Sequence, residues 1–152
     1  MRTVLSLIVF TTACWASSAF GTWKMDAIRS TFAGVAQPKS LIVRIEPHAK
    51  GEVFTLDRVE SDGRAMSSST VLYFDGAPRE LEDFGCSGTQ SSRRLDGQTV
   101  EVVRVCGDEE WTWLIRPSAV KSKDLTIDIT EKRGRSHVEW RIVLTRQEFA
   151  NR

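Results

Sequence analysis

The chain has 152 residues, of which 41% are hydrophobic, and its 21 basic and 20 acidic residues leave a formal net charge of +1. So balanced a chain has no overall field to attract nucleic acid or an anionic membrane surface, which excludes a partner bound through bulk charge. The length allows one domain with a sizeable core and leaves no room for two.

Residues 1–19 have the features of a signal peptide. A positively charged start leads into the apolar segment VLSLIVF, and the small residues ASSA follow and end at Ala19. Such a segment is removed during export, so we expect cleavage near Ala19 and a periplasmic or secreted protein. The folded domain is then predicted over residues 20–152.

Two features of the leader bear on a membrane-attached alternative. The apolar run breaks at Thr11 and Thr12, whereas a transmembrane helix needs about 18 or more continuous apolar residues. We therefore expect no stable membrane span. Cys14 could instead be the acylation site of a lipoprotein, but Thr11 stands where such a signal usually has Leu.

After the leader, short runs of alternating apolar and polar residues recur about every ten residues, with turn signals between them. In chain order they are SLIVRIEP, EVFTLDRVE, AMSSSTVLYF, SSRRL, TVEVVRVC, EWTWLIRP, DLTIDIT and SHVEWRIVLT. A period of two with one polar face predicts antiparallel strands and argues against a parallel α/β sheet, whose strands are apolar on both faces. No segment has the apolar stripe of an amphipathic helix.

The clearest run is DLTIDIT, in which Leu125, Ile127 and Ile129 point to one face. About eight to ten such strands must close or stack to remove their exposed edges, so the sequence predicts an all-β domain, either an up-and-down barrel or a sandwich. The segment RELEDFGCSGTQ lacks this alternation, and we do not expect a regular strand there.

Two cysteines, Cys86 and Cys106, remain after the predicted cleavage. In an exported chain an isolated pair is more often a structural disulfide than a metal site or a nucleophile. A cysteine nucleophile would also need a reduced thiol and an activating base. We therefore predict a Cys86–Cys106 disulfide.

Aromatic side chains provide the candidate ligand site. Trp111 and Trp113 share one face of a predicted strand, and Tyr73 ends another strand that is rich in Ser and Thr. These residues could line a cavity for an apolar or amphipathic molecule, with hydroxyl groups to orient it. The candidate hydroxyl groups belong to Ser67, Ser69 and Thr70. The alternative is plain core packing, because two tryptophans can fill a small barrel.

Arg104 has the same strand parity as Val100 and Val102. If that face points inward, the buried guanidinium needs a carboxylate, either internal or supplied by a ligand. The simpler expectation is that the strand twists and leaves Arg104 half exposed.

No catalytic motif is present. His48 lies in a predicted turn and His137 on the polar face of the last strand, and neither has neighbours at metal-ligand spacing. We therefore expect no enzymatic activity, no metal site and no cofactor.

The segments GTWKMDAIRSTF and PKSLIVRIEP, placed straight after the leader and followed by an all-β meander, carry a family resemblance. They resemble the lipocalin-like branch of the calycin barrels, and more narrowly a group of small exported bacterial proteins that begin with Gly-Thr-Trp-Lys. The resemblance implies an antiparallel barrel whose closed end is plugged by Trp23. It also implies that a basic side chain of the last strand, Arg146 or Arg141, lies across the indole ring in a cation-π contact.

The predicted role is to bind a small hydrophobic or amphipathic molecule as a non-catalytic carrier. The alternative is a filled barrel that acts through its surface, as an inhibitor or accessory module bound to a protein that the sequence does not identify. A carrier needs an apolar cavity of about 300 Å³ or more, whereas a surface module has a packed interior.

Overall fold

The structure is a computed structural model, and it describes residues 19–83, 85–118 and 123–148. It contains ten β-strands and, within these ranges, no helix. In chain order the strands are β1 (Gly21–Met25), β2 (Ser40–His48), β3 (Gly51–Val59), β4 (Ala65–Leu72), β5 (Arg79–Asp83), β6 (Cys86–Arg94), β7 (Val100–Cys106), β8 (Glu109–Pro117), β9 (Asp124–Arg133) and β10 (Ser136–Arg146). The predicted leader, apart from Ala19, lies outside the described residues, and so does Cys14.

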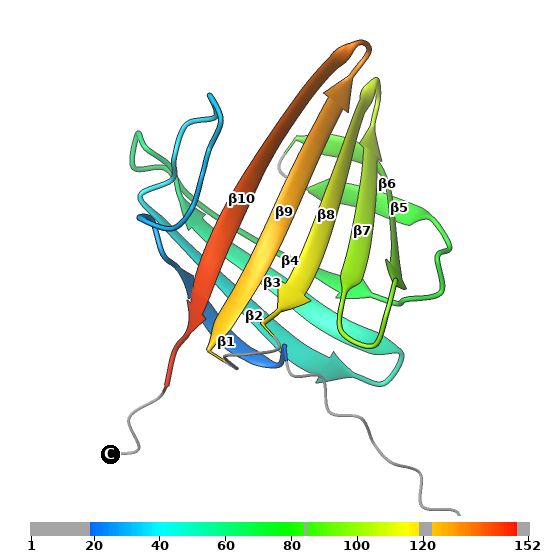
Figure 1. The fold of residues 1–152 in the computed structure, drawn as a ribbon. Helices are drawn as coiled ribbons and strands as arrows, with labels where there is room; N and C mark the ends of the chain where they lie inside the picture. Colours follow the sequence, from blue (N-terminus) through cyan, green and yellow to red (C-terminus); the bar gives the residue numbers. More distant parts are fainter. Residues whose placement is uncertain (1–18, 84, 119–122, 149–152) are drawn as a thin grey trace, which may run out of the picture.

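All ten strands belong to one antiparallel sheet with the order β4-β3-β2-β1-β10-β9-β8-β7-β6-β5. The sheet curls so that β1–β4 cross behind β7–β10 (Figure 1). The predicted all-β fold is confirmed, and of the two architectures it is the up-and-down barrel, nearly closed. The described part of the chain has no helix that is long and apolar enough to span a membrane.

Strand alternation builds the core. Leu125, Ile127 and Ile129 are buried on β9, and Ile142 and Leu144 are buried beside them on β10. Because β-strand side chains point alternately to the two faces, each strand of this kind contributes one apolar face to the interior and one polar face to solvent. The pairing of β9 with β10 places these apolar faces in register.

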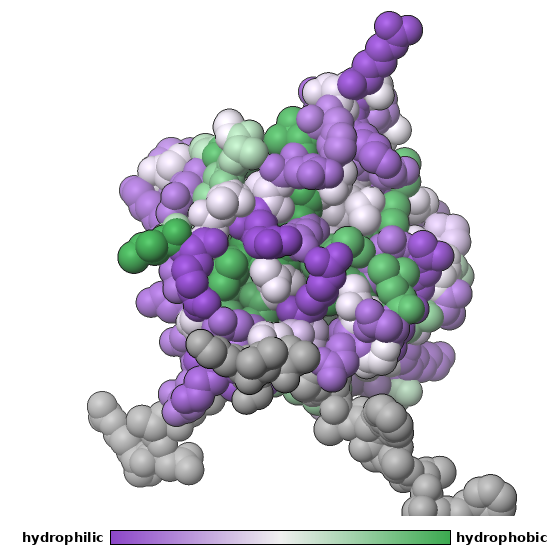
Figure 2. All heavy atoms as spheres, in the orientation of Figure 1, coloured by the Kyte–Doolittle hydropathy of each residue, from purple (hydrophilic) through white to green (hydrophobic). Residues whose placement is uncertain are grey.

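The outer face of the barrel is correspondingly polar. Figure 2 shows hydrophilic residues over most of this face, with hydrophobic residues in small separate groups between them. The most exposed large hydrophobic side chain is Ile28, in the turn that follows β1.

The barrel is joined by side chains where the two edge strands meet. β4 and β5 end the sheet and are not paired with each other. The Ser68 hydroxyl on β4 donates a hydrogen bond to Asp83 on β5, and the Gln90 amide on β6 donates to the Thr70 hydroxyl at 2.9 Å. Side-chain bonds therefore replace a backbone ladder at this seam.

The expectation that RELEDFGCSGTQ forms no regular strand is wrong. Arg79–Asp83 is β5, and residues 86–90 of the segment form the first part of β6. Alternation is hidden here because Leu81 is the one large apolar side chain buried on β5 and β6, and because Gly88 interrupts the pattern. A Cβ at Gly88 would lie 1.8 Å from the Val105 carbonyl oxygen, so the close approach of β6 to β7 requires glycine.

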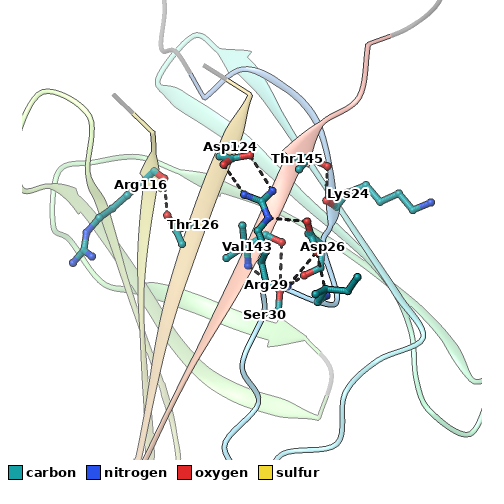
Figure 3. A network of polar contacts seen from close by, with 10 residues as sticks. Lys24, Asp26, Arg29, Ser30, Arg116, Asp124, Thr126, Val143 and Thr145 are labelled. Atoms are coloured by element: carbon teal, nitrogen blue, oxygen red, sulfur yellow. Dashed lines mark hydrogen bonds and ion pairs between the residues drawn. The ribbon is translucent and has the colours of Figure 1, made fainter. Parts of the chain in front are cut away.

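The segment between β1 and β2 runs along β10 and then reaches the open end of the barrel. Arg29 bridges Asp26, at 2.7 Å, and Asp124, at 2.8 Å, while the Val143 amide donates to the Ser30 hydroxyl at 3.0 Å (Figure 3). These contacts fix the segment to the outside of β9 and β10. The residues after it are thereby held over the barrel end.

Candidate ligand-binding site

Trp23 closes one end of the barrel, the end where the described part of the chain begins and finishes. Its ring is fully buried, and the Arg146 guanidinium carbon lies 4.3 Å from the ring centre. The indole N–H donates to the Ala19 carbonyl at 2.8 Å, and Arg146 Nη1 donates to the Phe20 carbonyl at 2.5 Å. Of the two basic residues that the resemblance implied, Arg146 is therefore the one across the ring.

Gly21 lies beside Arg146 at this end of the barrel, whereas Arg141 does not contact Trp23. Gly21 has φ +134°, and a Cβ there would lie 2.7 Å from Arg146 Nη1. Glycine at this position thus gives the arginine room to lie over Trp23. Arg141 points outward and binds Asp128 at 2.5 Å; this contact raises the pKa of its guanidinium through the hydrogen bond to Asp128.

The opposite end of the barrel contains two adjoining cavities. The first, of about 140 Å³, lies under the β1–β2 segment and is mostly apolar. Among its walls are Phe32, Phe54, Ile127, Ile129, Trp140 and Ile142. The second has a volume of about 450 Å³ and extends to the disulfide. Because Leu56, Arg58, Trp111 and Trp113 line both, we treat them as one open-end cavity.

Trp111 and Trp113 lie side by side on the cavity wall, as adjacent inward positions of β8. The Trp111 ring meets Trp140 edge to face at 5.8 Å, and the Trp113 ring lies 6.0 Å from Phe54. Trp113 Nε1 is buried and has no hydrogen-bond partner among the described residues. The two predicted tryptophans thus pack against the core on one side and border open space on the other.

Arg104 is buried, and the expectation of a half-exposed side chain is wrong: the residue is 7% exposed. Its Nε donates to Gln90 Oε1 at 2.9 Å, its Nη1 lies 3.1 Å from Asp83 Oδ2, and its guanidinium carbon lies 4.3 Å from the Trp113 ring centre. Burial lowers the pKa of the guanidinium, while the charge of Asp83 opposes this. The carboxylate that a buried arginine needs is therefore internal.

The charged groups around the open-end cavity balance. Two guanidiniums line it, those of Arg58 and Arg104, and three carboxylates, those of Glu60, Asp83 and Glu109. Arg58 Nη2 lies 2.6 Å from Glu60, and Glu109 is also paired with Arg133. The cavity wall consequently carries no surplus of positive charge.

Tyr73 lies elsewhere. It borders a separate pocket of about 350 Å³ beside the β4–β5 seam, and the Arg79 guanidinium stacks on its ring at 3.9 Å. Ser69 and Thr70 also line that pocket, whereas Ser67 faces outward and donates to Asp57 at 2.5 Å. The sequence grouped Tyr73 and these hydroxyls with the tryptophans, but the structure separates them.

The disulfide lies at the rim of the open-end cavity. Cys86 and Cys106 are bonded to each other, and both residues line the larger part of the cavity. The bond ties the start of β6 to the end of β7 beyond their last paired residues, Thr89 and Val105. In the described ranges no group of three or more His, Cys, Asp and Glu side chains is placed to hold a metal ion.

Several cavity residues were not identified from the sequence. Asp83 sits in the segment that showed no alternation, and Leu56 lies in the predicted strand EVFTLDRVE, from which no site residue was proposed. Arg58 faces the cavity from the end of β3. Parity could have grouped Leu56 with Arg58, because they are two residues apart on one strand.

Comparison with known proteins identifies the fold but no family for this chain. No protein-family model matches the chain, and no curated protein matches its sequence. Among solved structures it resembles a Schistosoma mansoni fatty acid binding protein in complex with arachidonic acid, with a TM-score of 0.55, 10% identity, and 87% of this chain and 98% of that chain covered. It also resembles the fluorescent protein UnaG, with a TM-score of 0.53, 14% identity, and 86% and 98% coverage. At such low identity the likeness shows the fold alone, an antiparallel β-barrel.

Proposed function

We propose that this protein is an exported, non-catalytic carrier that binds a small amphipathic molecule in the open-end cavity. The observation that carries the proposal is the cavity of about 450 Å³ bordered by Trp111 and Trp113. Ligand pockets of about 300–1,000 Å³ with aromatic walls and a few polar groups are typical of small-molecule sites. Barrels of this fold include a protein solved with arachidonic acid bound.

The division of the interior supports a carrier over a filled, surface-acting barrel. Trp23, Val43, Leu125 and Leu144 are fully buried near the closed end and leave the fold a packed core there. The cavity occupies the other end of the barrel, so it does not interrupt that core. A barrel that acts only through its surface is expected to be close-packed at both ends, without unfilled space beside two tryptophans.

Export is part of the proposal. It is supported by the leader-like residues 1–19 and by a disulfide, which persists in oxidising compartments and is rare in the cytosol. The narrower likeness to small exported bacterial lipocalin-like proteins, stated from GTWKMDAIRSTF, belongs to the same proposal. Fractionation of the native host should find the protein in the periplasm or medium.

A titration with Nile red, a neutral fluorescent dye, tests ligand binding. Wild-type protein should bind the dye saturably with a blue-shifted emission. Leu56→Trp should fill the cavity, because Leu56 lines both of its parts, and should weaken binding about tenfold or more, equivalent to about 1.4 kcal/mol.

Leu95→Trp is the matched control. It adds the same bulk at a side chain that is 47% exposed, in the loop between β6 and β7. This variant should bind Nile red like the wild type. Equal binding by all three proteins, or no binding by the wild type, would contradict a ligand site in the open-end cavity.

A further inference from the structure

The Arg104–Asp83 pair is a buried ion pair in the wall of the open-end cavity. Both side chains are almost completely buried, with 9% and 11% of their surfaces exposed, and both residues line the cavity. They come from β7 and β5, strands separated in the sheet by β6. The pair therefore presents a cation and an anion side by side to whatever occupies the space.

Each partner has one atom left over. Arg104 uses Nε for Gln90 and Nη1 for Asp83, and Asp83 Oδ2 accepts from Ser68 and Arg104. Arg104 Nη2 and Asp83 Oδ1 have no hydrogen bond within the part of the chain that the structure describes. Neither is among the atoms buried without a partner there, so both are open to the space that the two side chains line. One is a donor and the other an acceptor.

The position of Arg104 is fixed before any ligand arrives. Gln90 holds Nε, Asp83 holds Nη1, and the Trp113 ring covers one face of the guanidinium. Gln90 is itself held by Thr70 across the seam. A donor and an acceptor held in this way favour a ligand group that matches both, because little freedom is lost on binding.

Charge decides between possible groups. The guanidinium is already neutralised by Asp83, and the other charged groups of the cavity wall are paired too, Arg58 with Glu60 and Glu109 with Arg133. A ligand carboxylate would accept from Arg104 but would bring a second negative charge beside Asp83. Two negative charges held side by side repel each other, which disfavours a second carboxylate here. An uncharged group avoids that cost.

We propose that Arg104 and Asp83 form a head-group subsite for an uncharged ligand group that both accepts and donates a hydrogen bond, such as a primary amide or an alcohol. This rests on the proposed carrier function and names the ligand class. The ligand head group accepts from Arg104 Nη2 and donates to Asp83 Oδ1, while its apolar body lies against Trp111 and the apolar part of the cavity.

The test is a competition series in which decanamide, decanol and decanoate displace Nile red at neutral pH. Wild-type protein should bind decanamide and decanol about tenfold or more tightly than decanoate. Decanoate binding as tight as decanamide binding would overturn the subsite and leave the carrier function standing. Failure of Nile red to bind at all would instead overturn the carrier function.

Asp83→Asn separates this subsite from a general preference for uncharged chains. It removes the negative charge and keeps the side-chain size, so decanoate affinity should rise about tenfold and the preference should disappear. Glu82→Gln is the matched control on the same strand, since Glu82 is exposed and does not line the cavity; it should keep the wild-type preference. An Asp83→Asn protein that folds, by thermal melting, and retains the preference would overturn the subsite. If that variant does not fold, equal affinities of the wild type for decanamide and decanoate would still overturn the subsite.

Discussion

Trp23 is held on several sides at the closed end of the barrel. Arg146 covers its ring, the Ala19 carbonyl accepts from its N–H, and Val43 on β2 and Arg146 on β10 are its backbone neighbours. A smaller side chain here would leave a cavity and remove the cation-π contact with Arg146. The contacts therefore concentrate a large share of the closed end's stability in one residue.

Trp23→Ala should lower the free energy of unfolding by about 3–5 kcal/mol, the cost of deleting a buried aromatic side chain. Urea denaturation followed by circular dichroism measures it. Ile28→Ala is the control, because Ile28 is 97% exposed, and it should change stability by less than about 0.5 kcal/mol. An unchanged midpoint for Trp23→Ala would show that Trp23 does not plug the barrel.

The Asp26 carboxyl should titrate abnormally. Hydrogen bonds from the Arg29 side chain and backbone lower its pKa below the ordinary value of 3.8. A lowered folded-state pKa contributes stability above pH 3.8 that is lost as the pH falls through the folded pKa. NMR titration of the Asp26 carboxyl should thus give a midpoint below 3.8.

Arg29→Met should return that Asp26 midpoint part of the way toward 3.8, because it removes the Arg29 side-chain hydrogen bond, the largest cause of the lowered pKa, and keeps the backbone N–H donors of Ile28 and Arg29. Equal midpoints in the two proteins would show that Arg29 does not anchor the β1–β2 segment as the contacts indicate.

Arg104 is a residue whose position and partner the sequence predicts only in part. Parity with Val100 and Val102 raised the possibility of an inward position with a carboxylate partner, but the expectation was a half-exposed side chain, and the structure shows it buried. The identity of that carboxylate, Asp83, could not be found, because it lies 21 residues away on a strand that does not pair with β7. Without a known partner, an exposed position was the simpler expectation for a charged side chain.

At the scale of elements, alternation predicted the strands with apolar inner faces and failed for β5 and for the first part of β6, whose inner face is polar. β9 and β10 alternate visibly, and their buried residues match the pattern. β6 instead turns Gln90 and Ser92 inward, where Gln90 bonds Thr70 and Ser92 bonds the Phe74 amide. A strand stabilised by side-chain hydrogen bonds across a seam has no hydrophobic period to detect.

Gly88→Ala tests the close approach of β6 to β7. The added Cβ would lie 1.8 Å from the Val105 carbonyl oxygen, which is backbone and cannot rotate away, so the variant should lose about 3 kcal/mol. Gly97→Ala is the control, because no atom lies within 4 Å of its Cβ position, and it should stay within about 0.5 kcal/mol of the wild type. Similar stabilities for the two variants, measured by urea denaturation, would contradict the register of β6.

The disulfide should stabilise the β6–β7 corner measurably. Cys86 and Cys106 are 20 residues apart, and closing such a loop in the unfolded chain is worth about 3 kcal/mol on the chain-entropy account. The double variant Cys86→Ser, Cys106→Ser should lose about that amount in urea denaturation. Reductant should destabilise the wild type and leave the variant unchanged. Thiol labelling of unfolded, unreduced wild type at both cysteines would contradict the bond.

The whole molecule divides into a packed end and an open end. The closed end holds Trp23 under Arg146, and the open end holds Trp111 and Trp113 beside a cavity that contains the Arg104–Asp83 pair. The sequence predicted the barrel and brought the two tryptophans together. It could not show whether the space beside them is filled, because cavity volume depends on how strands far apart in the chain meet across the barrel.

The most direct test of a ligand cavity at the open end is the ¹H–¹⁵N NMR spectrum of the tryptophan indoles, assigned by Trp→Phe substitution, during titration with decanamide. The Trp111 and Trp113 signals should shift saturably because both residues line the cavity, while the Trp23 signal at the closed end should stay in place. No shift at Trp111 and Trp113, or an equal shift at Trp23, would contradict a ligand site in this cavity.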